Sequence, residues 1–333
     1  MEEKLLEIRN LVVDYTTDES VVHAVRGLDI MVSRGETFGL VGETGAGKTT
    51  TALSILRLLP EPMGKIRSGQ ILFEGKDLAS ASQHDMRQIR GKDIAMIFQD
   101  PMTSLNPVIR IGDQIAEVLQ IHDNTMTKEQ RFKRVDEVLQ MVGISPERRH
   151  EYPHQFSGGM QQRVVIAMAL VCEPKLILSD EPTTALDVTI QAQVLEMMRT
   201  LKDKLNTAMM LITHDLGVVA QTCDRVAVIY AGEIVELGHT ADIFEGRDHH
   251  PYTSGLFGSI PDLNGDNPRL RPIPGMMPDP TQLPTGCAFA ARCGHCTEKC
   301  KNQAPSPVWI GSHMIRCHLY AAIDTADTKE ETP

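Results

Sequence analysis

The feature that most constrains this sequence is a glycine-rich segment, Gly42-Glu43-Thr44-Gly45-Ala46-Gly47-Lys48-Thr49, which fits the pattern G-x-x-x-x-G-K-[ST]. A strand pattern at 37–41 precedes it, and a helical pattern at 49–59 follows and stops at Pro60. Glycines let backbone N–H groups surround a phosphate, while Lys48 neutralises its charge and the Thr49 hydroxyl offers a ligand for Mg²⁺. A chance glycine-rich turn would not combine this spacing with both side chains and both flanking elements. The segment therefore predicts a nucleotide site.

A second strand pattern ends in two acidic residues. The apolar run at 176–178 leads through Ser179 into Asp180 and Glu181, which would place two carboxylates at the carboxyl edge of a sheet. We expect Asp180 to orient the Mg²⁺ shell and Glu181 to polarise a water for in-line attack on a γ-phosphate. An acidic strand end alone is usually a solvated surface pair. Together with the glycine-rich segment, it predicts nucleotide hydrolysis.

Hydrophobic patterns divide the sequence into an α/β body. Strand patterns around 11–15, at 21–25 and at 28–32, with turn residues between them, fill 1–35 and predict an antiparallel β opening. Short apolar runs at 209–212 and 226–230 are separated by helix-like stretches, as in a parallel sheet. Apolar residues at helical spacing between 112 and 143 indicate a helical insert.

The composition changes near residue 260. Between 259 and 284, Pro, Gly, Asn and Asp replace the regular patterns, so we place a domain boundary there. We predict a nucleotide-binding domain at 1–259, with its helical insert at about 100–165. The remaining residues, 260–333, form an extension with a cysteine cluster and a polar tail.

Charge and hydropathy restrict the class of protein. The 333 residues include 33 Lys and Arg against 44 Asp and Glu, which gives a net charge of −11 and argues against a nucleic-acid binder. The start of the chain shows no secretory signal pattern, and no apolar run approaches the ~18 residues of a membrane span. We therefore expect a cytoplasmic protein.

Five of the seven cysteines lie between 287 and 317. Stable disulfides are rare in a reducing cytosol, so such a cluster indicates a metal site or redox chemistry. Five thiols exceed the four that a tetrahedral Zn²⁺ ion or an iron–sulfur cubane requires. Their spacing does not separate zinc from iron–sulfur. The two other cysteines, Cys172 and Cys223, have the surroundings of inert buried thiols.

Three further segments complete a recognisable order of motifs. Gln99 follows a strand pattern at 94–98, His214 closes a strand pattern at 209–213, and Phe156-Ser157-Gly158-Gly159-Met160 precedes a helical pattern. With the motifs above, these segments resemble the nucleotide-binding subunit of an ATP-binding-cassette (ABC) transporter over residues 5 to about 240. The resemblance implies an α/β fold: a P-loop NTPase (RecA-like) core with an antiparallel β subdomain and a helical insert, plus a small irregular cysteine-rich C-terminal extension.

The resemblance also implies a role for each matching residue. In the family, the serine and glycines that match Ser157, Gly158 and Gly159 bind the γ-phosphate held by a partner subunit, with the helix N-terminus adding positive charge. Gln99 matches a glutamine that senses Mg²⁺ and water, and His214 matches a histidine that hydrogen-bonds the γ-phosphate. The implied catalytic residues are Glu181, His214 and Gln99; the Mg²⁺ ligands are Thr49, Gln99 and Asp180; and the ATP-binding residues are Tyr15, Gly42, Glu43, Thr44, Gly45, Ala46, Gly47, Lys48, Thr49, Thr50, Gln99, Asp180, Ser157, Gly158 and Gly159.

Tyr15 lies where the family places an aromatic ring that stacks on adenine, although a strand tyrosine packed on the β layer is the alternative. Ala185-Leu186-Asp187 resembles the loop that communicates across the family's dimer. The segment at 156–160 departs from the commonest family pattern at its first and last positions, but the residues expected to touch phosphate are intact.

The segment that follows Gln99 and the C-terminal cysteines indicate one branch of the family. Asp100-Pro101-Met102-Thr103-Ser104-Leu105-Asn106-Pro107 resembles the oligopeptide and dipeptide permease branch, which includes nickel and glutathione importers, and the similarity is greatest to the dipeptide-permease ATPases. Members of that branch are thought to carry a [4Fe–4S] cluster. Their pattern selects Cys287, Cys293, Cys300 and Cys317 as its ligands and leaves Cys296 unmatched, with zinc as the alternative metal.

The resemblance implies an ATP-hydrolysing subunit that energises import of dipeptides or oligopeptides. Its implied partners are two transmembrane permease subunits, a second ABC ATPase subunit and, indirectly, an extracytoplasmic peptide-binding protein. Its implied location is the cytoplasmic face of the inner membrane. A nickel or glutathione importer is the alternative, and a soluble ABC ATPase without a transport role is disfavoured because the sequence shows no long coiled coil or second cassette.

Overall fold

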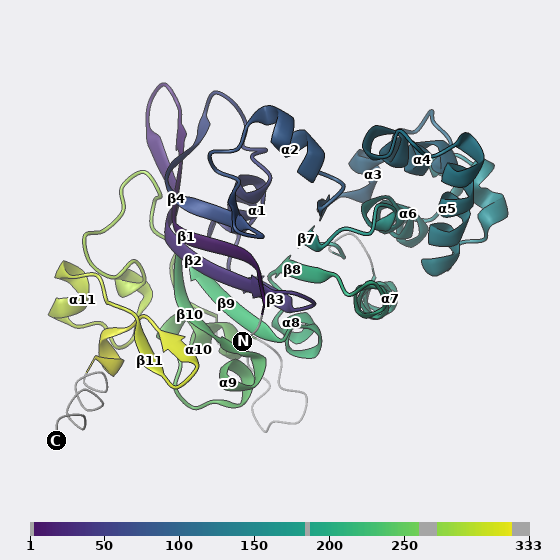
Figure 1. Cartoon of the computed structure of the whole chain (residues 1–333). Coiled ribbons are helices and arrows are strands. Elements are labelled where there is room, and N and C mark those ends of the chain that lie inside the picture. The colour runs from purple at the N-terminus through teal and green to yellow at the C-terminus, as the bar shows by residue number, and fades with distance from the viewer. Residues whose placement is uncertain (1–2, 184–186, 260–271, 322–333) are drawn as a thin grey trace, which may run out of the picture.

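The computed structural model describes residues 3–183, 187–259 and 272–321 (Figure 1). These residues form two β-sheets, a helical lobe and a C-terminal extension. The boundary predicted near 260 lies outside the described residues, so the division into 1–259 and 260–333 stays a prediction.

The larger sheet has the strand order β11-β12-β10-β9-β3-β8-β7-β6 in the described part of the chain. Its strands are β3 (Thr37–Val41), β6 (Ile94–Ile97), β7 (Leu176–Asp180), β8 (Ala208–Thr213), β9 (Arg225–Tyr230), β10 (Glu233–His239), β11 (Val308–Ile310) and β12 (His313–Ile315). The five from β9 to β6 pair in parallel, as the short apolar runs predict, and the remaining pairs are antiparallel. Because parallel strands end at the same edge, the segments that follow β3, β6, β7 and β8 meet there.

The smaller sheet is antiparallel and has the order β2-β1-β4-β5. Its strands are β1 (Lys4–Thr16), β2 (Val21–Ser33), β4 (Gly64–Phe73) and β5 (Lys76–Asp77). The sequence patterns at 21–25 and 28–32 predict two strands, but the structure joins them into β2. Gly27, with φ of +74°, is skipped in the pairing with β1 and forms a bulge that the alternating pattern does not reveal.

The helix that follows the glycine-rich loop, α1 (Lys48–Ile55), contributes to the core that both sheets share. Ala52 and Ile55 are completely buried there, beside apolar residues of β1, β3 and β8. Helix α2 (Gln83–Ile89) follows the smaller sheet and buries Met86 in the same core. The glycine-rich loop and α1 are therefore positioned by packing against both sheets.

The predicted helical insert is a lobe that stands apart from both sheets (Figure 1). It contains α3 (Pro101–Ser104), α4 (Ile111–His122), α5 (Lys128–Met141), α6 (Gly158–Leu170) and the short 3-10 turns η1 (Pro146–His150) and η2 (Pro153–Gln155). A second core, which includes Ile115 and Val138, fills the lobe and continues into β6 and β7. The lobe is thereby attached to the edge of the large sheet.

The C-terminal part of the chain packs against the opposite edge of that sheet. The helical elements that follow β7 in the chain are α7 (Val188–Leu205), α8 (Leu216–Thr222), α9 (Thr240–Glu245), α10 (Pro251–Gly258), η3 (Ala290–Arg292), α11 (Glu298–Asn302) and η4 (His318–Tyr320). Strands β11 and β12 extend the sheet next to β10. The irregular composition of this extension does not indicate these two strands. None of the helices in the described ranges is long and apolar enough to cross a membrane.

Candidate nucleotide-hydrolysis site

The glycine-rich loop connects β3 to α1 and fits tightly against neighbouring backbone. A Cβ atom on Gly42 would lie 2.2 Å from the carbonyl oxygen of Ile229, and one on Gly47 would lie 2.4 Å from that of Ala24. Gly47 also has a φ of +105°, which side-chain-bearing residues rarely adopt. These contacts explain why the motif requires glycine at these two positions.

Lys48 is buried under this loop. Its Nζ donates hydrogen bonds to the carbonyl oxygens of Gly42 (2.7 Å) and Glu43 (3.0 Å). Burial lowers the pKa of Lys48, and the nearby carboxylates of Glu181, Asp180 and Glu43 partly oppose this shift. A phosphate bound in the loop would give the ammonium group a charged partner in place of two carbonyls.

Thr49 and Asp180 provide neighbouring oxygen atoms at the start of α1 and the end of β7. The Thr49 side chain hydrogen-bonds to the Asp180 carboxylate, which is almost completely buried. Burial raises the pKa of Asp180, with smaller effects from Thr49, Glu181 and Lys48. A hydroxyl and a carboxylate are the oxygen ligands that Mg²⁺ prefers, so these two residues fit the predicted metal position.

Glu181 is the point at which the ends of three strands converge. Gln99, after β6, donates from Nε2 to Glu181 Oε2 (3.0 Å), and His214, after β8, has Nδ1 3.1 Å from Oε1. The backbone of Glu181 has a φ of +45° and is held by a hydrogen bond from its N–H to the Ile212 carbonyl (2.8 Å). Such strained backbone at a strand end is found preferentially at functional sites. The three residues predicted to be catalytic therefore form one hydrogen-bonded group.

Tyr15 lies close to the first turn of α1. Its hydroxyl is 3.3 Å from the Thr50 hydroxyl, and its ring borders Gly64. Tyr15 is half-buried, so one part of the side chain remains accessible. The structure therefore brings Tyr15 and Thr50 together with the phosphate loop.

Ser157, Gly158 and Gly159 begin α6 in the helical lobe, separate from α1 (Figure 1). Ser157 occupies the N-cap position without a capping hydrogen bond from its side chain, and both Ser157 and Gly158 are exposed. A Cβ on Gly158 would meet no atom within 4 Å, whereas one on Gly159 would lie 2.6 Å from Ile190 Cγ2. The start of α6 thus presents free N–H groups away from the chain's own phosphate loop.

Of the predicted communication loop, Ala185 and Leu186 lie outside the described residues. Asp187 is described, and it caps α7 by accepting a hydrogen bond from the Ile190 N–H (3.1 Å).

Four of the C-terminal cysteines line one cavity of about 140 Å³, namely Cys287, Cys293, Cys300 and Cys317. Cys296 is not among its lining residues; its thiol lies 3.6 Å from the Thr297 carbonyl. The four cysteines that line the cavity are those that the family pattern selects, and the choice of these four as ligands stays a prediction.

The thiols around this cavity differ in their surroundings. Burial raises the pKa of Cys287 to about 11 and also raises the pKa of Cys293 and Cys317. Burial acts in the same direction on Cys300, but hydrogen bonds with Thr297, the Cys300 backbone and the Cys296 thiol together outweigh it and lower the pKa of Cys300. Only Glu236, His249 and His313 among the described residues form a group of three metal-type ligand atoms within 4.8 Å, so no three cysteine sulfurs are that close together.

Tyr252 contacts the phosphate loop, and no sequence pattern points to it. The Tyr252 hydroxyl, at the start of α10, accepts a hydrogen bond from the backbone N–H of Glu43 (2.9 Å). The two residues are 209 positions apart, and no local pattern connects them.

Two family profiles match this chain. The ABC transporter family profile matches residues 25–184, and the profile of the oligopeptide/dipeptide transporter C-terminal region matches 235–300. The chain is 51% identical to the dipeptide transport ATP-binding protein DppD of Bacillus subtilis, over 95% of each chain. It belongs to the ATP-binding subunits of the oligopeptide and dipeptide ABC transporters.

Two other relatives from Bacillus subtilis share this level of identity. The oligopeptide transport ATP-binding proteins AppD and OppD are both 51% identical to this family member over 95% of its length, covering 97% and 89% of their own. Because the dipeptide and oligopeptide proteins are equally similar, identity does not favour the dipeptide-permease ATPases within the branch.

Solved structures show the same fold. A post-hydrolysis dimer of the ATP-binding cassette MJ0796, bound to ADP and Pi, superposes with a TM-score of 0.63 at 26% identity, covering 71% of this chain and 98% of that one. The ABC transporter component cbiO1 from Clostridium perfringens gives 0.63 at 27% identity, covering 73% and 92%. These likenesses confirm the predicted P-loop fold with its antiparallel β subdomain.

Proposed function

We propose that this chain hydrolyses ATP to drive the import of dipeptides or oligopeptides through membrane-embedded permease subunits. The observation that carries the proposal is the convergence of Gln99, Glu181 and His214 beside the phosphate loop. The names of the relatives supply the substrate class, since all three act in peptide transport. A nickel or glutathione importer remains the second candidate within the branch.

In this proposal the residues of the phosphate loop bind and orient the triphosphate. Lys48 leaves the Gly42 and Glu43 carbonyls to pair with a phosphate, and Thr49, Asp180 and Gln99 hold Mg²⁺. The metal ion stabilises the negative charge that develops on the transferred phosphoryl group. Tyr15 stacks on the adenine ring next to α1.

Glu181 acts as the base that polarises the attacking water. Its carboxylate is oriented by the amide of Gln99 and the imidazole of His214. Once nucleotide is bound, we expect both partners to be drawn toward the γ-phosphate and Mg²⁺, which leaves Glu181 free to accept a proton from water. The strained backbone at Glu181 keeps this carboxylate at the strand edge.

The site is completed by a second ATPase subunit. Ser157, Gly158 and Gly159 are exposed or half-exposed in a lobe separate from α1, so we assign them to the γ-phosphate of the partner's nucleotide. The dimeric MJ0796 cassette provides a precedent for such pairing. The second subunit is a copy of this chain or a paralogue. In both cases, each ATP site receives the serine and the two glycines at the start of α6 from the opposite chain.

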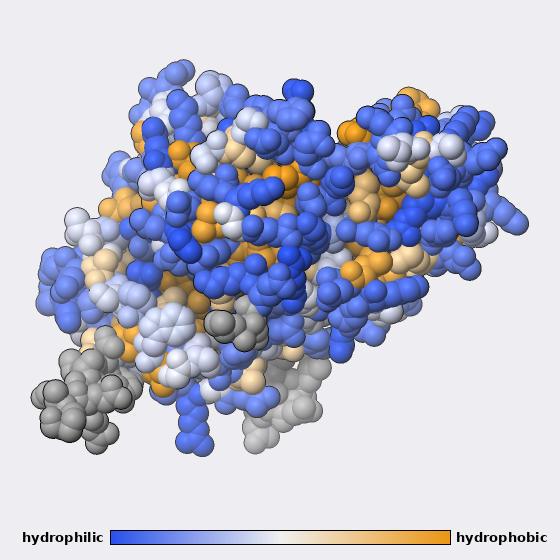
Figure 2. Space-filling model, in the orientation of Figure 1, coloured by the Kyte–Doolittle hydropathy of each residue, from blue (hydrophilic) through white to orange (hydrophobic). Residues whose placement is uncertain are grey.

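We assign the contact with the permease subunits to the segment where the helical lobe joins the large sheet after β6. Phe98 and Val108 flank the segment from Gln99 to Pro107 and are unusually exposed for apolar residues, at 44% and 78%. Figure 2 shows further hydrophobic patches on this lobe within a mostly hydrophilic surface. Docking here would join the membrane partner directly to Gln99 and hence to Glu181, with the chain bound peripherally to the cytoplasmic face of the inner membrane.

We also propose that Cys287, Cys293, Cys300 and Cys317 hold a [4Fe–4S] cluster. A tetrahedral zinc ion, with Zn–S bonds of about 2.3 Å, would bring its sulfur ligands to within about 3.8 Å of one another. The wider spacing of these thiols around a 140 Å³ cavity favours a larger group, with zinc as the alternative. A cluster bound there would carry the charge of four thiolates and link η3, α11 and the segment after β12.

Peptide uptake tests the transport proposal directly. The chain is assembled in lipid vesicles with two permease subunits and a second ATPase subunit of an oligopeptide/dipeptide transporter. The peptide-binding protein is added outside, and uptake of a labelled dipeptide, a labelled pentapeptide, Ni²⁺ and glutathione is measured with internal ATP. We expect ATP-dependent uptake of at least one peptide. Uptake of Ni²⁺ or glutathione alone would select the second candidate, and ATP hydrolysis without any uptake would contradict a transport role.

A further inference from the structure

An arginine of the C-terminal extension forms an ion pair with the phosphate loop. Arg292 ends η3, directly before Cys293, and its Nη1 lies 2.9 Å from Glu43 Oε2. The same nitrogen is 3.3 Å from the Tyr230 hydroxyl, and Nε donates to the Pro274 carbonyl (3.0 Å). The Arg292 side chain is only 6% exposed. This arginine is therefore fixed at several points rather than free in solvent.

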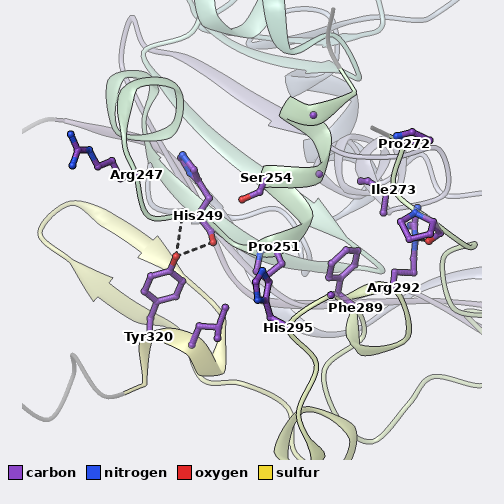
Figure 3. A pocket seen from close by; sticks show the side chains of 15 residues that line it. Arg247, His249, Pro251, Ser254, Pro272, Ile273, Phe289, Arg292, His295 and Tyr320 are labelled. Atoms are coloured by element: carbon purple, nitrogen blue, oxygen red, sulfur yellow. Dashed lines mark hydrogen bonds between the residues drawn. The ribbon is translucent and has the colours of Figure 1, made fainter. Parts of the chain in front are cut away.

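Aromatic rings enclose the Arg292 guanidinium group. Its central carbon lies 5.7 Å from the centre of the Tyr230 ring and 5.9 Å from that of Phe289. Arg292 and Phe289 together form one wall of a cavity of about 480 Å³ (Figure 3). Contacts of this kind hold the cation in place.

Glu43 is held by the C-terminal part of the chain at two points. Arg292 binds its carboxylate, and the Tyr252 hydroxyl accepts its backbone N–H. Tyr252 is completely buried, and its ring packs against Tyr230 and Phe289 at centroid distances of 4.6 and 5.6 Å. Glu43 is thus bound by two residues, Arg292 and Tyr252, that both pack in the same aromatic cluster.

The charge of Glu43 makes this contact important for nucleotide binding. A carboxylate on a loop that binds a triphosphate opposes the ligand's negative charge unless a cation neutralises it. Arg292 supplies that cation from outside the loop, so its effect on ATP is exerted through Glu43. Lys48, in contrast, is available to meet the phosphate itself.

We infer that Arg292 is a positioning residue of the ATP site, which neutralises Glu43 and makes nucleotide affinity depend on the integrity of the cysteine site. The link to the thiols is the backbone: Arg292 and Cys293 are consecutive, and Cys293 lines the cysteine cavity. The inference rests on the proposed function, because it takes the loop as the ATP site. Any coupling of this kind is reciprocal, so bound nucleotide would also stabilise the cysteine site.

The charge relation is tested with Arg292→Met, Glu43→Gln and the double variant. Affinity for a fluorescent ATP analogue with Mg²⁺ is measured on the full chain, with thermal unfolding as the folding control. We expect Arg292→Met to weaken binding by about threefold to tenfold, Glu43→Gln to tighten it, and the double variant to recover to within about twofold of wild type. Unchanged affinity in Arg292→Met, or a double variant as weak as Arg292→Met, would overturn the inference. Should Arg292→Met not fold, Arg292→Gln, which also removes the charge, takes its place in the same cycle with the same expected order.

The coupling to the thiols is tested with Cys293→Ser and Cys296→Ser as a matched pair. We expect Cys293→Ser to weaken nucleotide binding about threefold in the wild-type background but not in Arg292→Met, and Cys296→Ser to have no effect. Equal losses in both backgrounds, or no loss in Cys293→Ser, would overturn the coupling. Failure of the proposed ATP site is distinguishable, because wild type and Lys48→Ala would then bind the analogue equally poorly.

Discussion

Replacing Glu236 by Gln tests the energetic basis of the C-terminal attachment. Glu236 lies in β10 with no exposed surface. Its Oε1 accepts hydrogen bonds from His249 Nδ1 (2.9 Å) and His313 Nε2 (2.8 Å), and its Oε2 accepts from the His250 N–H (2.8 Å). One carboxylate therefore joins β10, β12 and the segment that leads into α10. We expect Glu236→Gln to destabilise the chain strongly.

The magnitude follows from the pKa of Glu236. Burial alone would raise that pKa, but the hydrogen bonds from His249 and His313 outweigh it and lower it from 4.5 to about 2. The difference corresponds to about 3 kcal/mol of stability at neutral pH. Because the folded pKa is depressed, this contribution is complete above pH 4.5 and is lost as the pH falls toward about 2. For a chain of this size, the loss should lower the melting temperature by roughly 5 °C.

His249 adds a pH dependence of the opposite sign. Its Nε2 lies 3.1 Å from the Gly246 carbonyl while Nδ1 faces Glu236, so both ring nitrogens have acceptors. The hydrogen bond to Glu236 raises the pKa of His249 above 6.5. Its charged form therefore stabilises the fold fully below pH 6.5, and this contribution is lost as the pH rises through the raised pKa.

Thermal unfolding of wild type, Glu236→Gln and the exposed control Glu196→Gln between pH 3.5 and 8 measures these effects. We expect the control to follow wild type at every pH. The difference in melting temperature between wild type and Glu236→Gln should be largest between about pH 5 and 6.5 and should become smaller at lower and at higher pH. A Glu236→Gln melting temperature within 1 °C of wild type, or a gap that does not change with pH, would refute the reasoning.

Three further predictions concern the ligand sites. Lys48→Ala should weaken nucleotide binding at least tenfold in calorimetry, because a phosphate charge loses its partner; unchanged affinity would contradict the loop assignment. Gly158→Ala should melt like wild type, since its new Cβ meets no atom within 4 Å, yet fail to form the ATP-dependent dimer in gel filtration. Anaerobically purified wild type and Cys296→Ser should contain equal amounts of iron and acid-labile sulfide, whereas Cys300→Ser should lose both; stoichiometric zinc in wild type would replace the cluster by a single metal ion.

Much of the fold could be predicted because the parallel strands are short and fully buried. The pattern at 37–41 has the same bounds as β3, and all five of its residues are buried. The convergence of Gln99, Glu181 and His214 also follows from sequence, since each comes directly after a strand pattern and parallel strands end at one edge. The hydrogen bonds among these three side chains could be identified only from the structure, because local residue spacing does not determine the order of strands in a sheet.

Contacts between distant segments could not be predicted. The pairing of β12 with β10 joins residues almost 80 positions apart across a proline-rich stretch, and Arg292 is 249 positions from Glu43. No periodicity connects such residues, and an arginine before a cysteine is an ordinary surface residue by sequence alone. The bulge at Gly27 was missed for a different reason: one skipped residue breaks the alternation and makes a single long strand resemble two.

In the proposed mechanism, Glu181 activates the water in an ATP site that a second subunit completes. ATP hydrolysis and dimer formation are measured for Glu181→Gln, with wild type in parallel. The amide fills the same space but cannot take a proton from water, so we expect ATP binding to persist, turnover by the assembled complex to fall at least 100-fold, and a stable ATP-bound dimer to accumulate. Turnover close to that of wild type in Glu181→Gln, or ATP binding without any dimer, would contradict the account.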